Sequence, residues 1–100
     1  MVKQVIVYWR DIPAQIILQR GRKREKFMLT HRFQAAIDRA AMRAGKGGSD
    51  AYLSEWRRDI SSFENTDPLE RIATRKAADF ETTFTDEKLE QMVRNKGLAH

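Results

Sequence analysis

The side chains that most often carry out chemistry in proteins are sparse in this sequence. Cysteine is absent, which excludes thiolate nucleophiles, thiolate metal sites and disulfides. The two histidines, His31 and His100, are not at the spacing of a metal-binding motif. His31 and Asp38 can share a helical face, but such a pair two turns apart is more typical of a surface than of a general base. We therefore expect no catalytic residue and no metal site, and we identify no cofactor.

A glycine-rich string, Gly45-Lys46-Gly47-Gly48-Ser49, has the composition of a phosphate-binding loop. Such a loop follows a strand and opens a helix at its Lys-Ser or Lys-Thr pair. Here a helical pattern precedes the string and a glycine follows the lysine. The string therefore predicts the end of a helix and a linker.

The elements that would position any functional residue follow from hydrophobic periodicity. Short apolar or alternating runs bounded by turn residues predict antiparallel strands. These runs lie near residues 4–9, 15–20 and 25–29. From Thr30 onward the period changes to that of helices. The predicted helices lie near residues 31–44, 50–60, 68–82 and 86–95.

The expected fold class is α+β, a three-stranded antiparallel β-meander followed by about four helices. One hundred residues correspond to about one domain. Within a single domain of residues 1–100, we assign the β-meander to 1–29, a helical pair to 30–60 and the C-terminal helices to 67–97.

The first strand is apolar on both sides, because its side chains alternate across the sheet. One side carries Val5, Val7 and Trp9, and the other carries Ile6 and Tyr8, joined by Ile17 of the second strand. We expect the helix near 31–44 to cover the first side. The second side then needs its own cover. Either the C-terminal helices supply it, or a partner protein or a second copy of the chain does.

Positive charge is concentrated in the first half of the chain, although the net charge is only +5. Residues 1–50 hold eleven lysines and arginines against four acidic residues, and residues 51–100 hold eight against ten. Five of seven residues in the stretch 20–26 are basic. This stretch is a solvated turn that protects strand edges, or it contacts nucleic-acid phosphates or an acidic partner.

Two short segments are the candidates for partner binding. The first segment surrounds the turn between the first two predicted strands, where the candidate residues are Tyr8, Arg10 and Asp11. The second is the basic stretch, where the candidates are Arg22, Lys23 and Arg24. Asp11 also fits ordinary turn chemistry.

Three strings together resemble a known family. They are Tyr8-Trp9-Arg10-Asp11-Ile12-Pro13-Ala14-Gln15, then Phe33 with Ala36-Ile37-Asp38 and Ala40 to Gly45, and then Asp50-Ala51-Tyr52-Leu53 with Trp56. The combination is similar to the small bacterial virulence factor domain, which also occurs in the larger staphylococcal virulence factor C. The resemblance covers roughly residues 4–58 and carries no catalytic residues. Short members of the family are often encoded near folate-dependent one-carbon enzymes, which suggests such an enzyme as a partner.

Two functions follow as hypotheses. The first is a non-catalytic accessory module that docks on a larger protein, such as a one-carbon enzyme, or on itself. The alternative is a small basic nucleic-acid-binding protein. The longest apolar run has five residues. The apolar core of a secretion signal needs about 7–15 residues, and a membrane span needs about 20. We therefore expect a soluble cytoplasmic protein without membrane contact.

Overall fold

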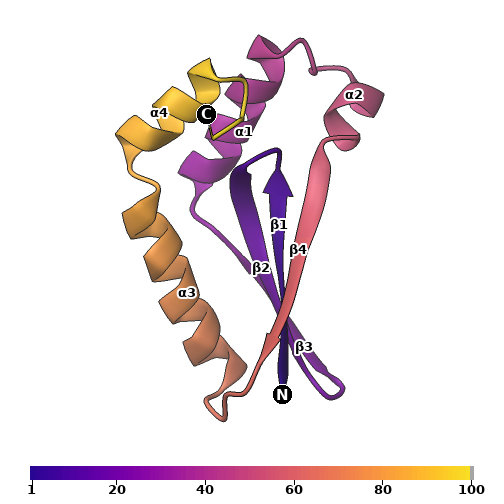
Figure 1. Ribbon diagram of the computed structural model, residues 1–100, viewed down its shortest axis with the longest axis vertical. Coiled ribbons are helices and arrows are strands. Elements are labelled where there is room, and N and C mark those ends of the chain that lie inside the picture. The colour runs from indigo at the N-terminus through magenta and orange to yellow at the C-terminus, as the bar shows by residue number, and fades with distance from the viewer. Residues whose placement is uncertain (100) are drawn as a thin grey trace.

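The protein folds as a four-stranded antiparallel sheet with its long helices on one face (Figure 1). The structure, a computed structural model, describes residues 1–99. Its strands are β1 (Val2–Trp9), β2 (Ile12–Arg20), β3 (Lys23–Met28) and β4 (Trp56–Phe63). Its helices are α1 (His31–Arg43), α2 (Ser49–Leu53), α3 (Leu69–Thr83) and α4 (Asp86–Arg94).

The α+β class and most of the predicted elements are confirmed. The first three strands form the expected antiparallel meander, and α1, α3 and α4 lie where the helical periodicity placed them. The first reversal occurs at Arg10 and Asp11, within the predicted segment. Gly21 permits the second reversal because its φ of 59° is costly for residues with a side chain.

The prediction of one helix over residues 50–60 is wrong. Helix α2 ends at Leu53, and the following residues form β4, which pairs with β1 from Val2 to Trp9. The sheet order is therefore β3-β2-β1-β4. Without β4, β1 would be an exposed edge strand although it is apolar on both faces. Pairing with β1 therefore outweighs the local helical spacing of Leu53, Trp56 and Ile60.

The predicted assignment of the two sheet faces is also wrong. The main core packs Ile6, Ile16 and Leu18 against side chains of α1, α3 and α4. Val5, Val7 and Ile17 instead form a separate small cluster on the opposite face. Because cross-strand neighbours share a face, the pairs Val5–Ile17 and Ile6–Ile16 fix this arrangement.

Trp9 departs from simple alternation because the β1–β2 pairing is irregular. The register shifts between Val7 and Tyr8, and such irregularities bend a strand and increase its twist. Beyond this point Trp9 is fully buried in the main core rather than with Val5 and Val7.

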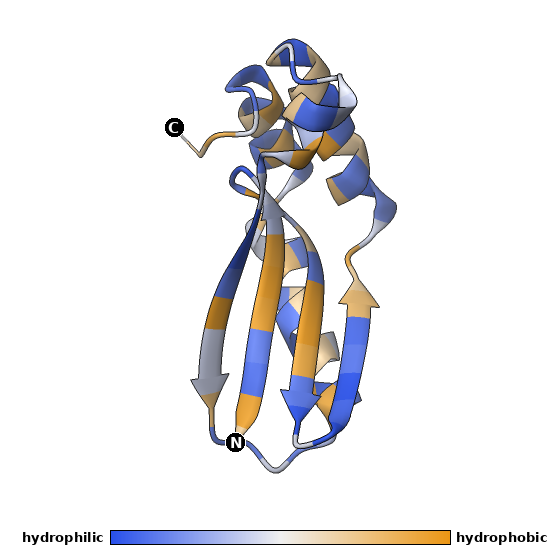
Figure 2. Cartoon of the chain, turned by 90° about the vertical axis from the view of Figure 1, so that its right-hand side faces the viewer, coloured by the Kyte–Doolittle hydropathy of each residue, from blue (hydrophilic) through white to orange (hydrophobic). Residues whose placement is uncertain are grey.

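The C-terminal helices cover the side of the sheet that carries Ile6 and Tyr8, as one of the two predicted alternatives had it, but α1 lies on that side as well. Helices α1, α3 and α4 all contribute to the same core, on the side of Ile6. Figure 2 views the sheet from the other side, and no helix lies in front of the strands. The side without a helix among the described residues is therefore that of Val5 and Val7, which α1 was expected to cover.

Candidate functional site

The uncovered side of the sheet is the candidate functional site, and we call it the open face. Strand pairing and alternation place twelve side chains on it, in three rows that each run from β3 to β4. The rows are Met28–Gln15–Val7–Arg58, Lys26–Ile17–Val5–Ile60 and Arg24–Gln19–Lys3–Ser62.

The middle of the open face is aliphatic. Val5, Val7 and Ile17 are shielded to 7% exposure or less, although no helix covers them. The shielding therefore comes from neighbouring side chains on the same face, including Trp56, which contacts this cluster. At its edges Ile60 and Met28 remain 63% and 64% exposed. Large aliphatic side chains in this position mark surfaces that bind other molecules when they are contiguous.

A hollow of about 250 Å³ lies at one end of the open face. It is lined by Val7, Gln15, Trp56, Arg57 and Arg58. The side-chain oxygen of Gln15 is buried and accepts no hydrogen bond from the described residues. The hollow thus combines the apolar side chains of Val7 and Trp56 with two arginines and the side-chain oxygen of Gln15.

The charges of the open face are all positive. Lys3, Arg24, Lys26 and Arg58 are exposed, and none of the twelve residues is acidic. Within residues 1–99, none of these four cations takes part in an ion pair. The face therefore has an aliphatic centre with uncompensated basic side chains around it.

The predicted residues Arg10 and Asp11 lie at the opposite end of β1 from the basic turn, where internal contacts hold them. Arg10 has a φ of 52°, and its guanidinium donates to the Lys96 carbonyl at 2.9 Å and to Glu55 at 3.3 Å. The Asp11 carboxylate accepts the Ala99 N–H at 2.7 Å and an Arg57 N–H at 3.2 Å. These bonds tie the hairpin to β4 and to the end of the chain.

Tyr8, the third residue predicted there, lies under Arg57. The guanidinium carbon of Arg57 is 4.4 Å from the centre of the Tyr8 ring, a cation–π contact. Burial raises the pKa of the Tyr8 phenol above its ordinary value, and the carboxylate of Asp59 raises it further, while Arg57 opposes the rise. The phenol therefore stays protonated, and it has no feature of a general base.

The other predicted candidates, Arg22, Lys23 and Arg24, lie at the exposed β2–β3 turn. Arg24 belongs to the open face as well. Arg20, just before the turn, donates to the backbone carbonyls of Asn65 and Asp67 at 2.8 and 2.7 Å. Part of the basic stretch thus fastens the loop before α3, while its outer residues extend the positive surface.

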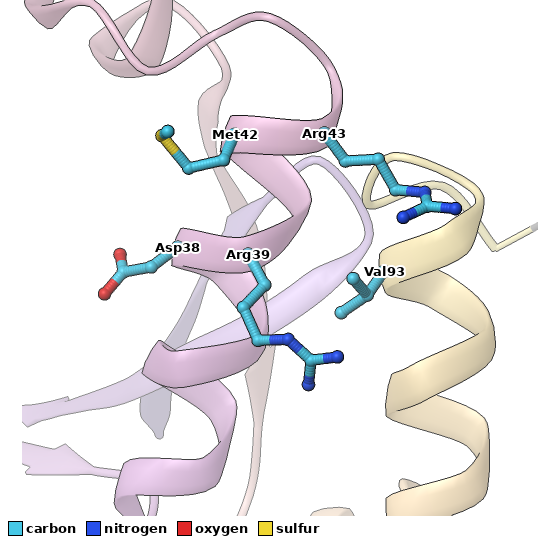
Figure 3. A pocket seen from close by; sticks show the side chains of 5 residues that line it. All are labelled: Asp38, Arg39, Met42, Arg43 and Val93. Carbon is cyan, nitrogen blue, oxygen red and sulfur yellow. The ribbon is translucent and has the colours of Figure 1, made fainter.

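A second hollow, of about 510 Å³, opens between α1 and α4 (Figure 3). Figure 3 shows Arg39 and Arg43 directed toward α4, whereas Asp38 and Met42 point away from it. Arg39 is already bound to Glu90 at 2.7 Å. Because its polar groups diverge, this hollow is a weaker candidate than the open face.

The potential metal ligands of residues 1–99 are scattered. No group of three or more potential metal ligands occurs in residues 1–99. His31 is exposed at the start of α1, and His100 lies outside the described residues. In the same part of the chain, no helix is long and apolar enough to cross a membrane.

Comparison with known proteins gives the family. A family model described as Virulence factor matches residues 7–93, from β1 to α4. The chain belongs to the Virulence factor family. This confirms the resemblance seen in the sequence. No curated protein and no solved structure matched the chain.

In this member of the Virulence factor family, the sequence strings behind the resemblance mainly build the core and the turn contacts. The Trp9 indole donates to the Tyr52 carbonyl at 2.9 Å, and Arg10 and Asp11 hold the first turn. Lys26 of the open face belongs to the basic stretch 20–26 that the sequence singled out. Sequence reasoning missed Arg58 and Ile60, because the incorrect helix over residues 50–60 concealed both.

Proposed function

We propose that the protein is a non-catalytic interaction module whose open face docks on a larger protein. The observation that carries this proposal is the one-sided sheet. All three long helices contribute to the main core, while Val5, Val7 and Ile17 form a second cluster that no helix covers. Antiparallel sheets can leave one face to solvent, but such a face is normally polar.

The composition of the open face fits a reversible protein interface. Interfaces of this kind have an apolar centre and a polar rim. Here the centre is Val5, Val7 and Ile17, with Ile60 beside them, and long polar side chains lie around it. Those side chains keep the free protein's apolar surface small.

The family resemblance suggests a folate-dependent one-carbon enzyme as the larger protein on which this face docks. The alternative, nucleic-acid binding, is favoured by the exposed cations at the β2–β3 turn. It is weakened because the aromatic side chain that contacts the open face, Trp56, is partly buried and none of the twelve residues is aromatic, whereas single-stranded nucleic acids are bound largely by stacking of successive bases on aromatic side chains.

Site-specific photo-crosslinking in the source cells tests the proposal. A photoreactive amino acid would replace Ile60 on the open face or, as a matched control, the exposed Glu87 on α4. We expect a discrete protein adduct from position 60 only, and the same adduct when the identified protein and this chain are mixed in purified form. Equal adducts from both positions, or failure to reconstitute the adduct, would refute docking through this face.

A further inference from the structure

We infer that the open face selects a partner protein whose contact surface is acidic around an apolar centre. The inference rests on the proposed function, which assigns docking to this face, and it adds the chemistry of the partner. It follows from the sign and position of the charges on the face.

The basic residues form a rim around the aliphatic centre. Arg24 and Lys26 lie on the edge strand β3, Arg58 lies on the other edge strand β4, and Lys3 lies near the start of β1. The chain has 14 acidic residues, but none is among the twelve of the open face. A rim of one sign repels partners of the same sign and favours those of the opposite sign.

Outside the open face, six of the fifteen lysines and arginines take part in ion pairs with acidic residues of the chain. Arg10 is bound by Glu55, Arg32 by Glu81 and Asp86. On the open face, by contrast, the four cations have no carboxylate partner among residues 1–99. These four solvated cations are therefore accessible to carboxylates of another molecule.

A second copy of the chain does not supply them through the same face. In a face-to-face pair, the rims of both copies would be positive, and like charges brought together in an interface oppose association. Nucleic acid offers the opposite charge but little aliphatic surface to pack on the exposed Ile60. Trp56 beside the face is partly buried, and none of the twelve residues is aromatic, so these positions offer no ring on which successive bases stack. An acidic protein surface with an apolar centre matches both parts of the face.

The test uses three synthetic amphipathic helical peptides with one leucine face and an acidic, neutral or basic polar face. Each is titrated into the full chain, and backbone amide NMR spectra report where it binds. We expect the acidic peptide to shift amides of the four strands and to bind at least about tenfold more tightly than the neutral one, because each exposed ion pair is worth a factor of roughly 1.4–5. Binding should weaken as salt is raised from about 0.05 to about 0.5 M.

Charge reversal supplies the matched variants. The double variant Lys26→Glu with Arg58→Glu should lose the preference for the acidic peptide and gain one for the basic peptide. The control Arg71→Glu changes the charge equally per site but lies on α3, and it should behave like the wild type. If charge reversal perturbs the amide spectrum of the free protein, the milder pair Lys26→Gln and Arg58→Gln takes its place, and it should abolish the preference without reversing it.

The outcomes separate this inference from the proposed function. Equal binding of the neutral and acidic peptides at the open face would overturn the acidic preference and leave docking through the face intact. Shifts on the face with a single-stranded DNA oligonucleotide or with phosphatidylglycerol vesicles, but with no peptide, would overturn both. Absence of any shift on the face with all three peptides would also overturn the inference.

Discussion

Three isoleucine-to-alanine substitutions measure directly which face of the sheet is covered. Ile6 and Ile17 are both 4% exposed, but Ile6 lies in the main core under the helices and Ile17 lies on the open face. Ile60, on the same face, is 63% exposed. Exposure alone would predict the same loss of stability at Ile6 and Ile17. The arrangement of the helices predicts different losses.

The expected losses follow from what surrounds each side chain. Truncating Ile6 leaves a cavity closed by the helices, so its cost should be about 3–4 kcal/mol, within the range for buried large-to-small changes. At Ile17 the flexible neighbours can close over the site or water can enter, which places the cost near the low end, about 2 kcal/mol. Ile60 buries roughly a third of its surface, so its loss should be about 0.5–1 kcal/mol.

Urea unfolding of the three variants and the wild type gives the free energies of unfolding. Each kcal/mol should also lower the melting temperature by about 4–8 °C for a domain of this size. A cost for Ile17→Ala equal to that of Ile6→Ala, within about 0.5 kcal/mol, would show that Ile17 is packed under a rigid cover. The assignment of an open face would then be refuted.

Two further predictions concern the internal contacts. Gly97 has a φ of 92°, and a Cβ there would lie 2.8 Å from the Trp9 ring, whereas Gly21 has a φ of 59° and open space around it. In urea unfolding, Gly97→Ala should therefore cost at least about 1 kcal/mol more than Gly21→Ala. Equal costs would refute the close contact. Burial alone would raise the pKa of Glu81, but hydrogen bonds from the Thr30 hydroxyl and N–H hold it below its ordinary value. The resulting stability is present above the unfolded-state pKa and is lost as pH falls through the lower folded-state pKa. Glu81→Gln should therefore reduce the loss of unfolding free energy on acidification, measured by urea unfolding at a series of pH values. An unchanged loss would contradict this.

The sequence predicted the elements whose signals are local. The meander, α1 and the two C-terminal helices all follow from strong periodicity and turn residues. Helix α4, for example, begins after the N-cap Thr85, whose hydroxyl accepts the Lys88 N–H. These features depend on residues a few positions apart, which a single sequence displays directly.

The sequence did not predict β4 or the choice of faces, because both depend on distant partners. The stretch from Trp56 to Phe63 is a strand only because β1 offers a free edge to pair with. Since β1 is apolar on both sides, its own pattern could not say which side the helices would cover. The missed strand also concealed Arg58 and Ile60, and with them one of the four basic and one of the four aliphatic residues of the site.

The central claim, docking of the open face on a larger protein, is tested most directly by one affinity comparison. The protein identified by crosslinking from position 60 would be titrated calorimetrically with the wild type and with Ile60→Asp, using Arg71→Asp on α3 as the control. Ile60 is exposed, so neither substitution should change stability by more than about 1 kcal/mol. We predict a loss of affinity of at least about 30-fold for Ile60→Asp, the scale of an anchor residue worth about 2 kcal/mol, and none for the control. Unchanged affinity of a folded Ile60→Asp variant would contradict the account.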